Sequence, residues 1–229
     1  MIEAVVFDLD GTLLDTIEDI ADSVNYALKT YELPILGYED CKKFVGDGAL
    51  HLCEKSLNIS KANCRNSMTC QFPGAEDILG LYREHYAVNS KNKTKPYKGI
   101  GNELILIQKA GIPMSIISNK PERFTKELVE EYFPEIRFRY VIGESKLFLK
   151  KPDPESLKFV MNKMHVEPQK TAYVGDSEID IYTAAAAKAI PVGVLWGFRD
   201  KRILGEAGAK ILIEKVEDLY NDLIGRKIP

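Results

Sequence analysis

The chain has 229 residues, of which 45% are apolar, so it can bury a sizeable core as one large domain or as a domain with a smaller one inserted. Its formal net charge of −3 supplies no basic field that would recruit nucleic acid or an anionic membrane, and we expect neither as a partner. No apolar stretch approaches the roughly 20 residues that span a bilayer, and the N-terminal apolar run breaks at Asp8, unlike a signal peptide. Cysteines without CxxC spacing and three scattered histidines favour neither a disulfide framework nor a zinc site, so we expect a reduced, cytoplasmic location.

Short apolar runs in the outer parts of the chain predict the strands of a sheet. Continuous runs of this kind are typical of strands that are buried on both faces. In chain order, the expected strands are 3–8, 113–118, 139–142, 171–175, 191–195 and, at an edge, 209–213. Helical patterns lie between them, at 102–110, 121–132, 153–164 and 178–188. This alternation predicts an α/β fold with a parallel sheet and helices on both of its faces.

The stretch from residue 17 to about residue 90 has a different pattern. Its apolar residues recur at helical spacing, as in Ile17, Ile20, Ala21, Val24, Ala27 and Leu28, and it contains no strand candidate. Polar residues 90–99, which end with Pro96 and Gly99, have the composition of a linker. We therefore expect an α/β core domain of residues 1–16 and 91–229, with an α-helical domain of residues 17–90 inserted after the first strand.

Two aspartates, Asp8 and Asp10, follow the first predicted strand in the sequence AVVFDLDGT. Side chains two residues apart in a strand project to the same side, so the two carboxylates are expected to lie close together. At about 4 Å they would repel each other by about 4 kcal/mol at an effective dielectric constant of about 20. A proton, a cation or a backbone turn at Gly11 would relieve that repulsion, and a solvated turn without function is the simplest alternative.

Other polar residues follow the second and fourth predicted strands. Ser118 ends the second strand, and Asp176 and Asp180 follow the fourth. Lys150 and Lys151 precede a predicted helix. Ligands of an open parallel sheet bind outside the carboxyl ends of its strands, so these groups are expected at one edge. Carboxylates suit a hard cation such as Mg²⁺, whereas a hydroxyl and an ammonium group suit a phosphate.

Each of these residues also has a purely structural interpretation. Ser118 would serve as a helix N-cap before Pro121, and Asp176 and Ser177 would cap the helix at 178–188. The two lysines would be solvated. Because all these groups follow strand ends in a matching order, we favour the functional interpretation.

Four motifs resemble those of the haloacid dehalogenase superfamily, specifically its phosphoglycolate phosphatase-like branch. They are DLDGTLLDT at 8–16, ISN at 117–119, KP at 151–152 and GDSEID at 175–180. The resemblance covers almost the whole chain and implies a Rossmann-like core with a mobile α-helical cap. Residues 60–75 match the pattern poorly, so the specificity of the cap is the least transferable part.

The resemblance also implies a role for each matching residue. Asp8 would be the nucleophile that forms an aspartyl-phosphate, and Asp10 would act first as general acid and then as general base. Ser118 and Lys151 would bind the transferring phosphoryl group. Asp8, the backbone carbonyl of Asp10, and Asp176 would hold Mg²⁺. The supporting residues would be Asp180, which assists the metal or orients Lys151, and the motif residues Asn119, Gly11 and Thr12.

The expected function is therefore that of a Mg²⁺-dependent phosphoric monoester hydrolase. Its substrate would be a small phosphorylated metabolite, with phosphoglycolate as the first candidate and sugar phosphates, nucleotides and pyrophosphate still open. One alternative is a β-phosphoglucomutase-like phosphomutase, which would share the core residues and differ mainly in the cap. An alternative of another class is a non-catalytic, receiver-like phospho-switch. For the assembly we expect a monomer or a homodimer.

Overall fold

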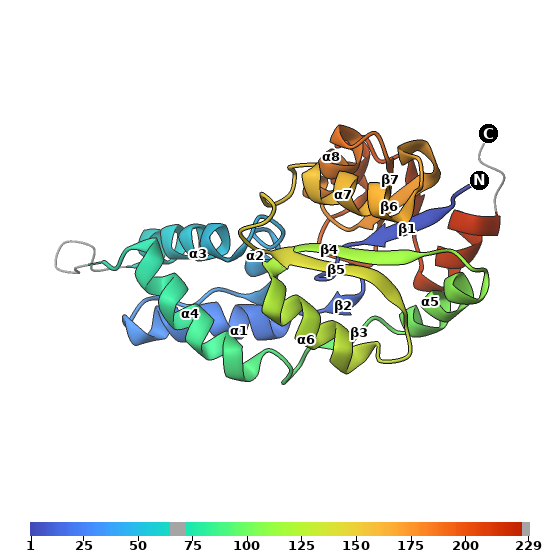
Figure 1. The fold of residues 1–229 in the computed structure, drawn as a ribbon. Coiled ribbons are helices and arrows are strands. Elements are labelled where there is room, and N and C mark those ends of the chain that lie inside the picture. Colours follow the sequence, from blue (N-terminus) through green and yellow to red (C-terminus); the bar gives the residue numbers. More distant parts are fainter. Residues whose placement is uncertain (65–71, 226–229) are drawn as a thin grey trace. The chain divides into compact units, whose positions relative to one another are not determined.

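A computed structural model describes residues 1–64 and 72–225 of the protein (Figure 1). The chain divides into two compact units. The core unit consists of Met1–Asp15 together with the chain from Pro96 onward, and the helical unit consists of Thr16–Lys95. The poorly matching stretch 60–75 of the sequence lies partly outside the described residues.

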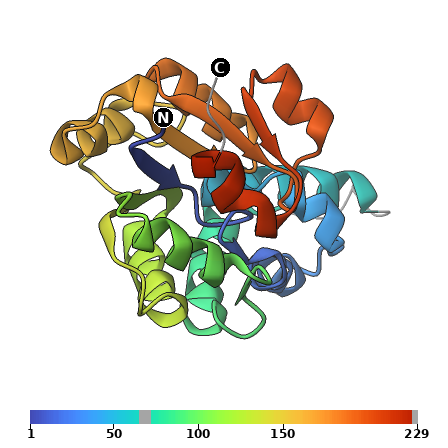
Figure 2. The ribbon, with the colours of Figure 1, turned by 90° about the vertical axis from the view of Figure 1, so that its right-hand side faces the viewer.

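The core unit contains a six-stranded sheet in the order β5-β4-β1-β6-β7-β8, and every neighbouring pair is parallel. The strands are β1 (Ala4–Phe7), β4 (Met114–Pro121), β5 (Phe138–Glu144), β6 (Thr171–Gly175), β7 (Ile190–Val194) and β8 (Ile211–Ile213). In Figure 2 the dark blue β1 lies between green and orange segments, as its pairing with β4 and β6 requires. All six predicted strands are present, and the predicted α/β fold is confirmed.

Helices cover both faces of this sheet (Figure 1). On one face, α5 (Ile100–Lys109) and α6 (Glu122–Tyr132) pack on a cluster that includes Phe7 and Ile116. On the other face, α7 (Glu155–Met164) and α8 (Glu178–Ala186) pack on a cluster that includes Val6 and Ile117. Adjacent residues of one strand thus enter opposite clusters, as the alternation of side chains along a strand dictates. Burial on both faces explains why these strands are continuously apolar.

Several short elements were not predicted. Two two-residue strands, β2 (Leu14–Asp15) and β3 (Lys95–Pro96), form a separate small sheet. The helix α9 (Lys201–Glu206) precedes β8, and Asp200 caps it by accepting a hydrogen bond from the Ile203 amide at 2.9 Å. Short turns of 3-10 helix lie at Pro168–Lys170 and Val216–Asp218, and one π-helical turn lies at Asn221–Gly225.

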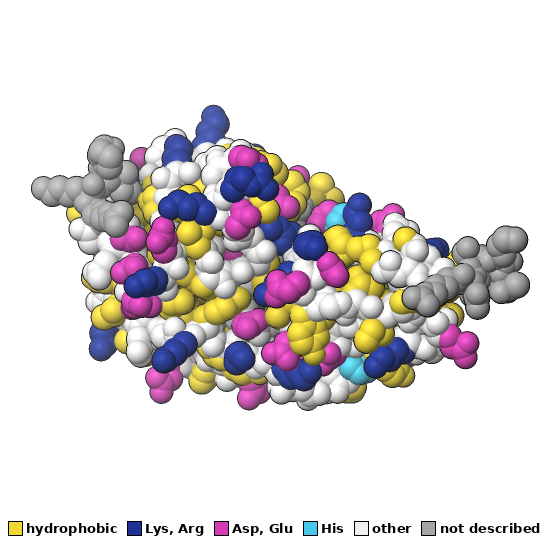
Figure 3. All heavy atoms as spheres, turned by 180° about the vertical axis from the view of Figure 1, so that it is seen from behind, with side chains coloured by type: hydrophobic (Ala, Val, Ile, Leu, Met, Phe, Trp, Pro, Cys, Tyr) yellow, Lys and Arg dark blue, Asp and Glu magenta, His cyan; other side chains and the backbone are white. Residues whose placement is uncertain are grey.

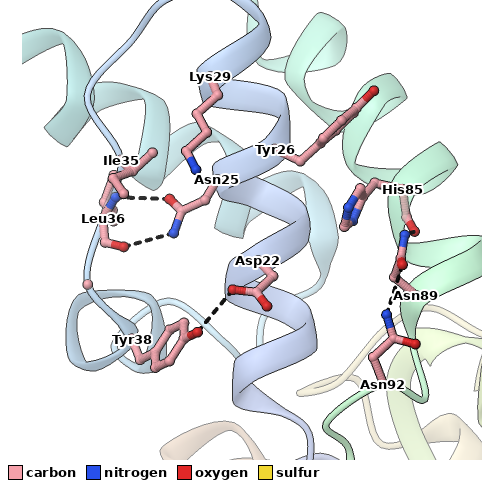
Figure 4. A pocket seen from close by; sticks show the side chains of 11 residues that line it. Asp22, Asn25, Tyr26, Lys29, Ile35, Leu36, Tyr38, His85, Asn89 and Asn92 are labelled. Atoms are coloured by element: carbon pink, nitrogen blue, oxygen red, sulfur yellow. Dashed lines mark hydrogen bonds between the residues drawn. The ribbon is translucent and has the colours of Figure 1, made fainter.

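The helical unit contains α1 (Ile17–Thr30), α2 (Tyr38–Lys42), α3 (Ala49–Asn63) and α4 (Ala75–Asn89). The apolar stripe predicted for α1 is buried, and this helix packs against α4. The side-chain amide of Asn25 holds the segment after α1, because it donates to the Leu36 carbonyl and accepts from the Leu36 amide, both at 2.9 Å (Figure 4). The buried carboxylate of Asp19 accepts hydrogen bonds from the Lys93 and Thr94 amides and so fastens the end of the unit.

The remaining features of the fold are the distribution of surface charge, the hydropathy of the helices and the state of the cysteines. On the face drawn in Figure 3, basic and acidic side chains are interspersed. Across residues 1–64 and 72–225, no helix is long and apolar enough to cross a membrane. Cys41, Cys53 and Cys64 carry free thiols, and Cys70 lies outside the described residues.

Candidate active site

The central strand and its two neighbours bring the motif residues to one edge of the sheet. Asp8 follows the last residue of β1, Ser118 lies near the end of β4, and Asp176 follows the last residue of β6. Since β1 pairs in parallel with both β4 and β6, the carboxyl ends of the three strands meet at that edge. These three polar residues are no more than 5% exposed.

Lys151 connects two of the buried carboxylates. Its ammonium group lies 2.9 Å from Asp8 Oδ1 and 2.6 Å from Asp180 Oδ1. The other oxygen of Asp180 accepts hydrogen bonds from the hydroxyl and the amide of Ser177 at 2.7 and 3.0 Å. Both oxygens of Asp180 are therefore occupied by neighbours, which suits a residue that orients Lys151. Lys150, by contrast, is exposed.

Asp176 is held by the loops around it. Its Oδ1 accepts a hydrogen bond from the Thr12 hydroxyl at 3.0 Å, and its Oδ2 accepts one from the Phe198 amide at 2.8 Å. Gly11 has a φ of +82°, and a Cβ there would collide with the Asp176 carboxylate. A Cβ at Gly197 would also collide with Asp176. The two glycines therefore allow loop backbone to approach this carboxylate more closely than any larger residue would.

Burial and mutual repulsion raise the pKa values of two of these carboxyl groups. Burial is the main cause for Asp8, and with the charges of Asp180 and Asp10 it raises the pKa to about 7, although Lys151 acts in the opposite direction. Burial, followed by the charges of Asp180 and Asp8, raises the pKa of Asp176 well above its usual value. Burial opposes the charge on Lys151, but Asp180 and Asp8 outweigh it and raise the pKa of the lysine.

Asp10 has a cation of its own. The Lys120 ammonium lies 2.9 and 3.0 Å from the two carboxylate oxygens of Asp10, and the lysine side chain is 4% exposed. Sequence analysis did not identify Lys120, because the second strand was expected to end at Ser118. The strand instead continues to Pro121 and so includes Lys120, although its pairing with β5 is irregular between Ile117 and Pro121. Extending the expected strand by two residues past Ser118 would have found this lysine.

Ser118 and Asn119 contact the backbone rather than cap a helix. The helix α6 begins at Glu122, which rules out the N-cap interpretation of Ser118, whose hydroxyl oxygen accepts from the Lys120 amide at 3.2 Å. The Asn119 side chain accepts from the Lys151 amide at 2.7 Å and donates to the Lys151 carbonyl at 3.0 Å. It thereby fixes the backbone that carries the buried lysine. The Lys151–Pro152 peptide bond is cis.

The donor set at this edge fits a divalent cation. Asp8, Asp176 and Asp180 each offer a carboxylate oxygen, and these oxygens all lie within 4.8 Å of one another. With Asp10, four carboxylates share two ammonium groups, those of Lys151 and Lys120, which leaves two negative charges unbalanced. An all-oxygen set with this excess charge suits Mg²⁺. The side chain of Asp10 is directed to Lys120, so of this residue only the backbone carbonyl remains a candidate ligand.

A pocket lies entirely within the helical unit, away from the residues of the acidic cluster in the sequence (Figure 4). Its volume is about 600 Å³, and its lining includes Asp22, Tyr26, Lys29, Tyr38 and His85. The Tyr26 and His85 rings stack with their centroids 4.5 Å apart. Asp22 accepts from the Tyr38 hydroxyl at 3.0 Å and pairs with the Lys93 ammonium at 2.7 Å. Asp22 and Tyr38 therefore have partners within the helical unit, which is a structural explanation for both groups.

The parallel sheet, the inserted helical stretch and the carboxylate-rich strand ends define an α/β protein whose candidate site lies at the carboxyl ends of the central strands. Residues 5–194 match the family model of the haloacid dehalogenase-like hydrolases. A phosphoglycolate phosphatase of Pseudomonas putida is 36% identical over 94% of this chain and 77% of its own length. The phosphoglycolate phosphatase 1 of Pseudomonas aeruginosa is 34% identical with the same coverage. The chain belongs to the haloacid dehalogenase-like hydrolase family.

Solved structures share the fold over nearly the whole chain. A crystal structure from Lactobacillus delbrueckii subsp. bulgaricus, provisionally named a phosphoglycolate phosphatase, is 30% identical with a TM-score of 0.89 and covers 98% of this chain and 99% of its own. One from Thermotoga maritima, provisionally named a beta-phosphoglucomutase, has a TM-score of 0.73 at 23% identity and covers 96% of this chain and 97% of its own. At that lower identity, the Thermotoga structure supports the fold alone.

Proposed function

We propose that this hydrolase is a Mg²⁺-dependent phosphatase that cleaves the phosphate monoester of a small metabolite, with phosphoglycolate as the first substrate to test. The observation that carries the proposal is the buried contact of Asp8 with Lys151 at a strand edge that also holds Asp176 and Asp180. The names of the Pseudomonas relatives support the choice of phosphoglycolate. The expected partner is therefore a small phosphorylated molecule.

In the proposed mechanism, a carboxylate oxygen of Asp8 attacks phosphorus while the bond to the ester oxygen breaks. Asp10 gives its proton to the departing oxygen, and the alcohol leaves. Water then attacks the phosphorus of the aspartyl-phosphate and passes a proton to Asp10, which releases inorganic phosphate and restores Asp8. Lys151 and Ser118 bind the phosphoryl oxygens, and Asp180 and Asn119 keep Lys151 in place.

When bound, Mg²⁺ would supply positive charge opposite the phosphoryl oxygens, which is the main requirement of phosphoryl transfer. Asp8, Asp176 and the backbone carbonyl of Asp10 would hold it. Thr12 and the glycine at position 11 would keep the Asp176 carboxylate in position. The residues expected as the inserted domain, 17–90, would act as a cap that closes over the substrate and excludes water.

The decisive experiment measures phosphate release by the purified protein from p-nitrophenyl phosphate and from a panel that contains phosphoglycolate, sugar phosphates, nucleotides and pyrophosphate. We expect turnover that EDTA abolishes and Mg²⁺ restores. Asp8→Asn should lower kcat at least about a thousand-fold, with the circular dichroism spectrum unchanged. Retained turnover in this variant would refute the assignment of Asp8 as the nucleophile. An isomerised sugar phosphate in place of free phosphate would instead indicate a phosphomutase.

A further inference from the structure

The ion pair between Asp10 and Lys120 is a contact at the strand edge that the proposed mechanism leaves unused. Both side chains belong to the core unit: Asp10 follows β1, and Lys120 lies on β4. The two nitrogen–oxygen distances of 2.9 and 3.0 Å are nearly equal, so the ammonium group bridges both carboxylate oxygens. This contact fixes the distance and direction of the Asp10 carboxyl group relative to β4.

Stability alone does not account for a lysine in this place. Its side chain is 4% exposed, and lysines are almost never fully buried unless they are paired. Apolar residues of similar volume are often as stabilising as a buried ion pair. Ile116 and Ile117, earlier in the same strand, are apolar and buried. A lysine at position 120 is therefore better explained by the carboxylate that it holds.

We propose that Lys120 is a positioning residue that orients the Asp10 carboxylate for proton transfer. The inference rests on the proposed function, in which Asp10 gives a proton to the leaving oxygen and later takes one from water. A proton donor or acceptor works only within hydrogen-bond reach of its partner atom. The division of labour between the lysines follows from the contacts: Lys151 serves Asp8 and Asp180, and Lys120 serves Asp10.

The test is a double-mutant cycle on Asp10 and Lys120, measured with p-nitrophenyl phosphate and with the best natural substrate of the panel. Lys120→Met should lower kcat by about 10- to 100-fold while KM changes less than about twofold, because proton transfer suffers and phosphate binding does not. In the Asp10→Asn background the same change should have almost no further effect on kcat, since a residue that acts through Asp10 has nothing left to act on. Lys120→Arg, which keeps the charge in another shape, should recover part of the loss.

The control is Lys126→Met on α6, which removes a half-exposed lysine paired with Glu122 and should leave both kinetic constants unchanged. If Lys120→Met fails to fold, Lys120→Gln takes its place in the cycle. A raised KM would overturn the inference, because Lys120 would then act on the substrate. The inference would also fail if the fold-losses in kcat of the two single variants multiplied in the double variant, because Lys120 would then act independently of Asp10. If the wild-type enzyme is active and Lys120→Met has the same kcat, only the inference about Lys120 is overturned. If the wild-type enzyme is inactive, the proposed function and the inference fail together.

Discussion

At the scale of single residues, Gly11 is the position where backbone geometry and the acidic cluster depend most directly on each other. Its φ of +82° disfavours any residue with a Cβ, and the Asp176 carboxylate fills the space that the Cβ would need. Gly111 is a control that separates the backbone conformation from the crowding. It has a φ of +76°, but no neighbouring atom lies within 4 Å of the place that a Cβ would take.

We expect Gly11→Ala to abolish the response of the protein to Mg²⁺, because Asp176 must move. The substitution should also lower the free energy of unfolding by more than the about 1–2 kcal/mol that a left-handed backbone costs a residue with a Cβ. Gly111→Ala should incur only that backbone cost and keep full activity. Thermal unfolding with and without Mg²⁺, together with phosphatase assays, measures both effects. Equal behaviour of the two variants would contradict the packing argument.

Sequence reasoning at this scale depended on knowing where each strand ends. Asp8, Asp10, Ser118 and Asp176 were placed near one edge because each follows or ends an apolar run. A proton, a cation or a turn was expected to relieve the repulsion between Asp8 and Asp10, and in the structure each of the two carboxylates also contacts a different lysine. Lys120 was missed because the second strand was expected to end at Ser118. The contact of Phe198 with Asp176 is a backbone interaction, and nothing in the side-chain pattern indicates it.

At the scale of elements, Asn119 joins the end of β4 to the segment that carries Lys151. Its side chain bonds the amide and the carbonyl of that one residue, and all of these groups are buried. Removing the amide would leave two buried backbone groups unsatisfied. Each such group costs about 1–3 kcal/mol.

We expect Asn119→Ala to lower the free energy of unfolding by about 2–5 kcal/mol, from two lost partners at about 1–3 kcal/mol each with partial relaxation. KM should rise more than kcat falls, because a displaced Lys151 binds the phosphoryl group less well. Asn119→Asp can still accept from the Lys151 amide but cannot donate to the Lys151 carbonyl. Its stability and KM should therefore lie between those of the parent protein and those of Asn119→Ala. Urea unfolding and steady-state kinetics test this order, and an alanine variant as stable as the parent would exclude the joining role.

Continuous apolar runs made the six strands of the main sheet predictable, whereas the shortest elements were not predictable. A two-residue strand such as β2 or β3 has no periodicity to detect, and it forms only because its partner lies nearby in the folded chain. The six-residue helix α9 is too short for a helical repeat and depends on its Asp200 cap. Tertiary contacts, which a single sequence does not display, decided the two short strands, whereas α9 begins at a local cap.

At the scale of the whole molecule, the acidic cluster links stability to pH and to metal. Without a metal, the pKa of Asp8 rises from 3.8 to about 7 on folding, so the folded state binds a proton that the unfolded state has released. This contribution to stability is fully present below pH 3.8 and is lost as the pH rises through about 7. A divalent cation binds the deprotonated carboxylate and should reverse that loss.

We therefore expect the increase in melting temperature caused by Mg²⁺ to be small at mildly acidic pH and larger at mildly alkaline pH. At a hundred times the dissociation constant, binding adds about 2.7 kcal/mol, which corresponds to about 5–10 °C for a chain of this size. Thermal scans with Mg²⁺ or with EDTA at both pH values provide the measurement. Asp176→Asn should show a much smaller metal effect at either pH, and a shift independent of pH in the parent protein would contradict the linkage.

The position of β1 in the middle of the sheet has a consequence for the order in which the protein assembles during synthesis. Val5 pairs with Met114 on one side and with Ala172 on the other, so the strand that leaves the ribosome first must wait for partners made far later. The helical unit is one continuous stretch, Thr16–Lys95, and can complete its own contacts during that wait. Since pairings between distant segments form slowly, closure of the sheet around this early strand should limit the rate of folding.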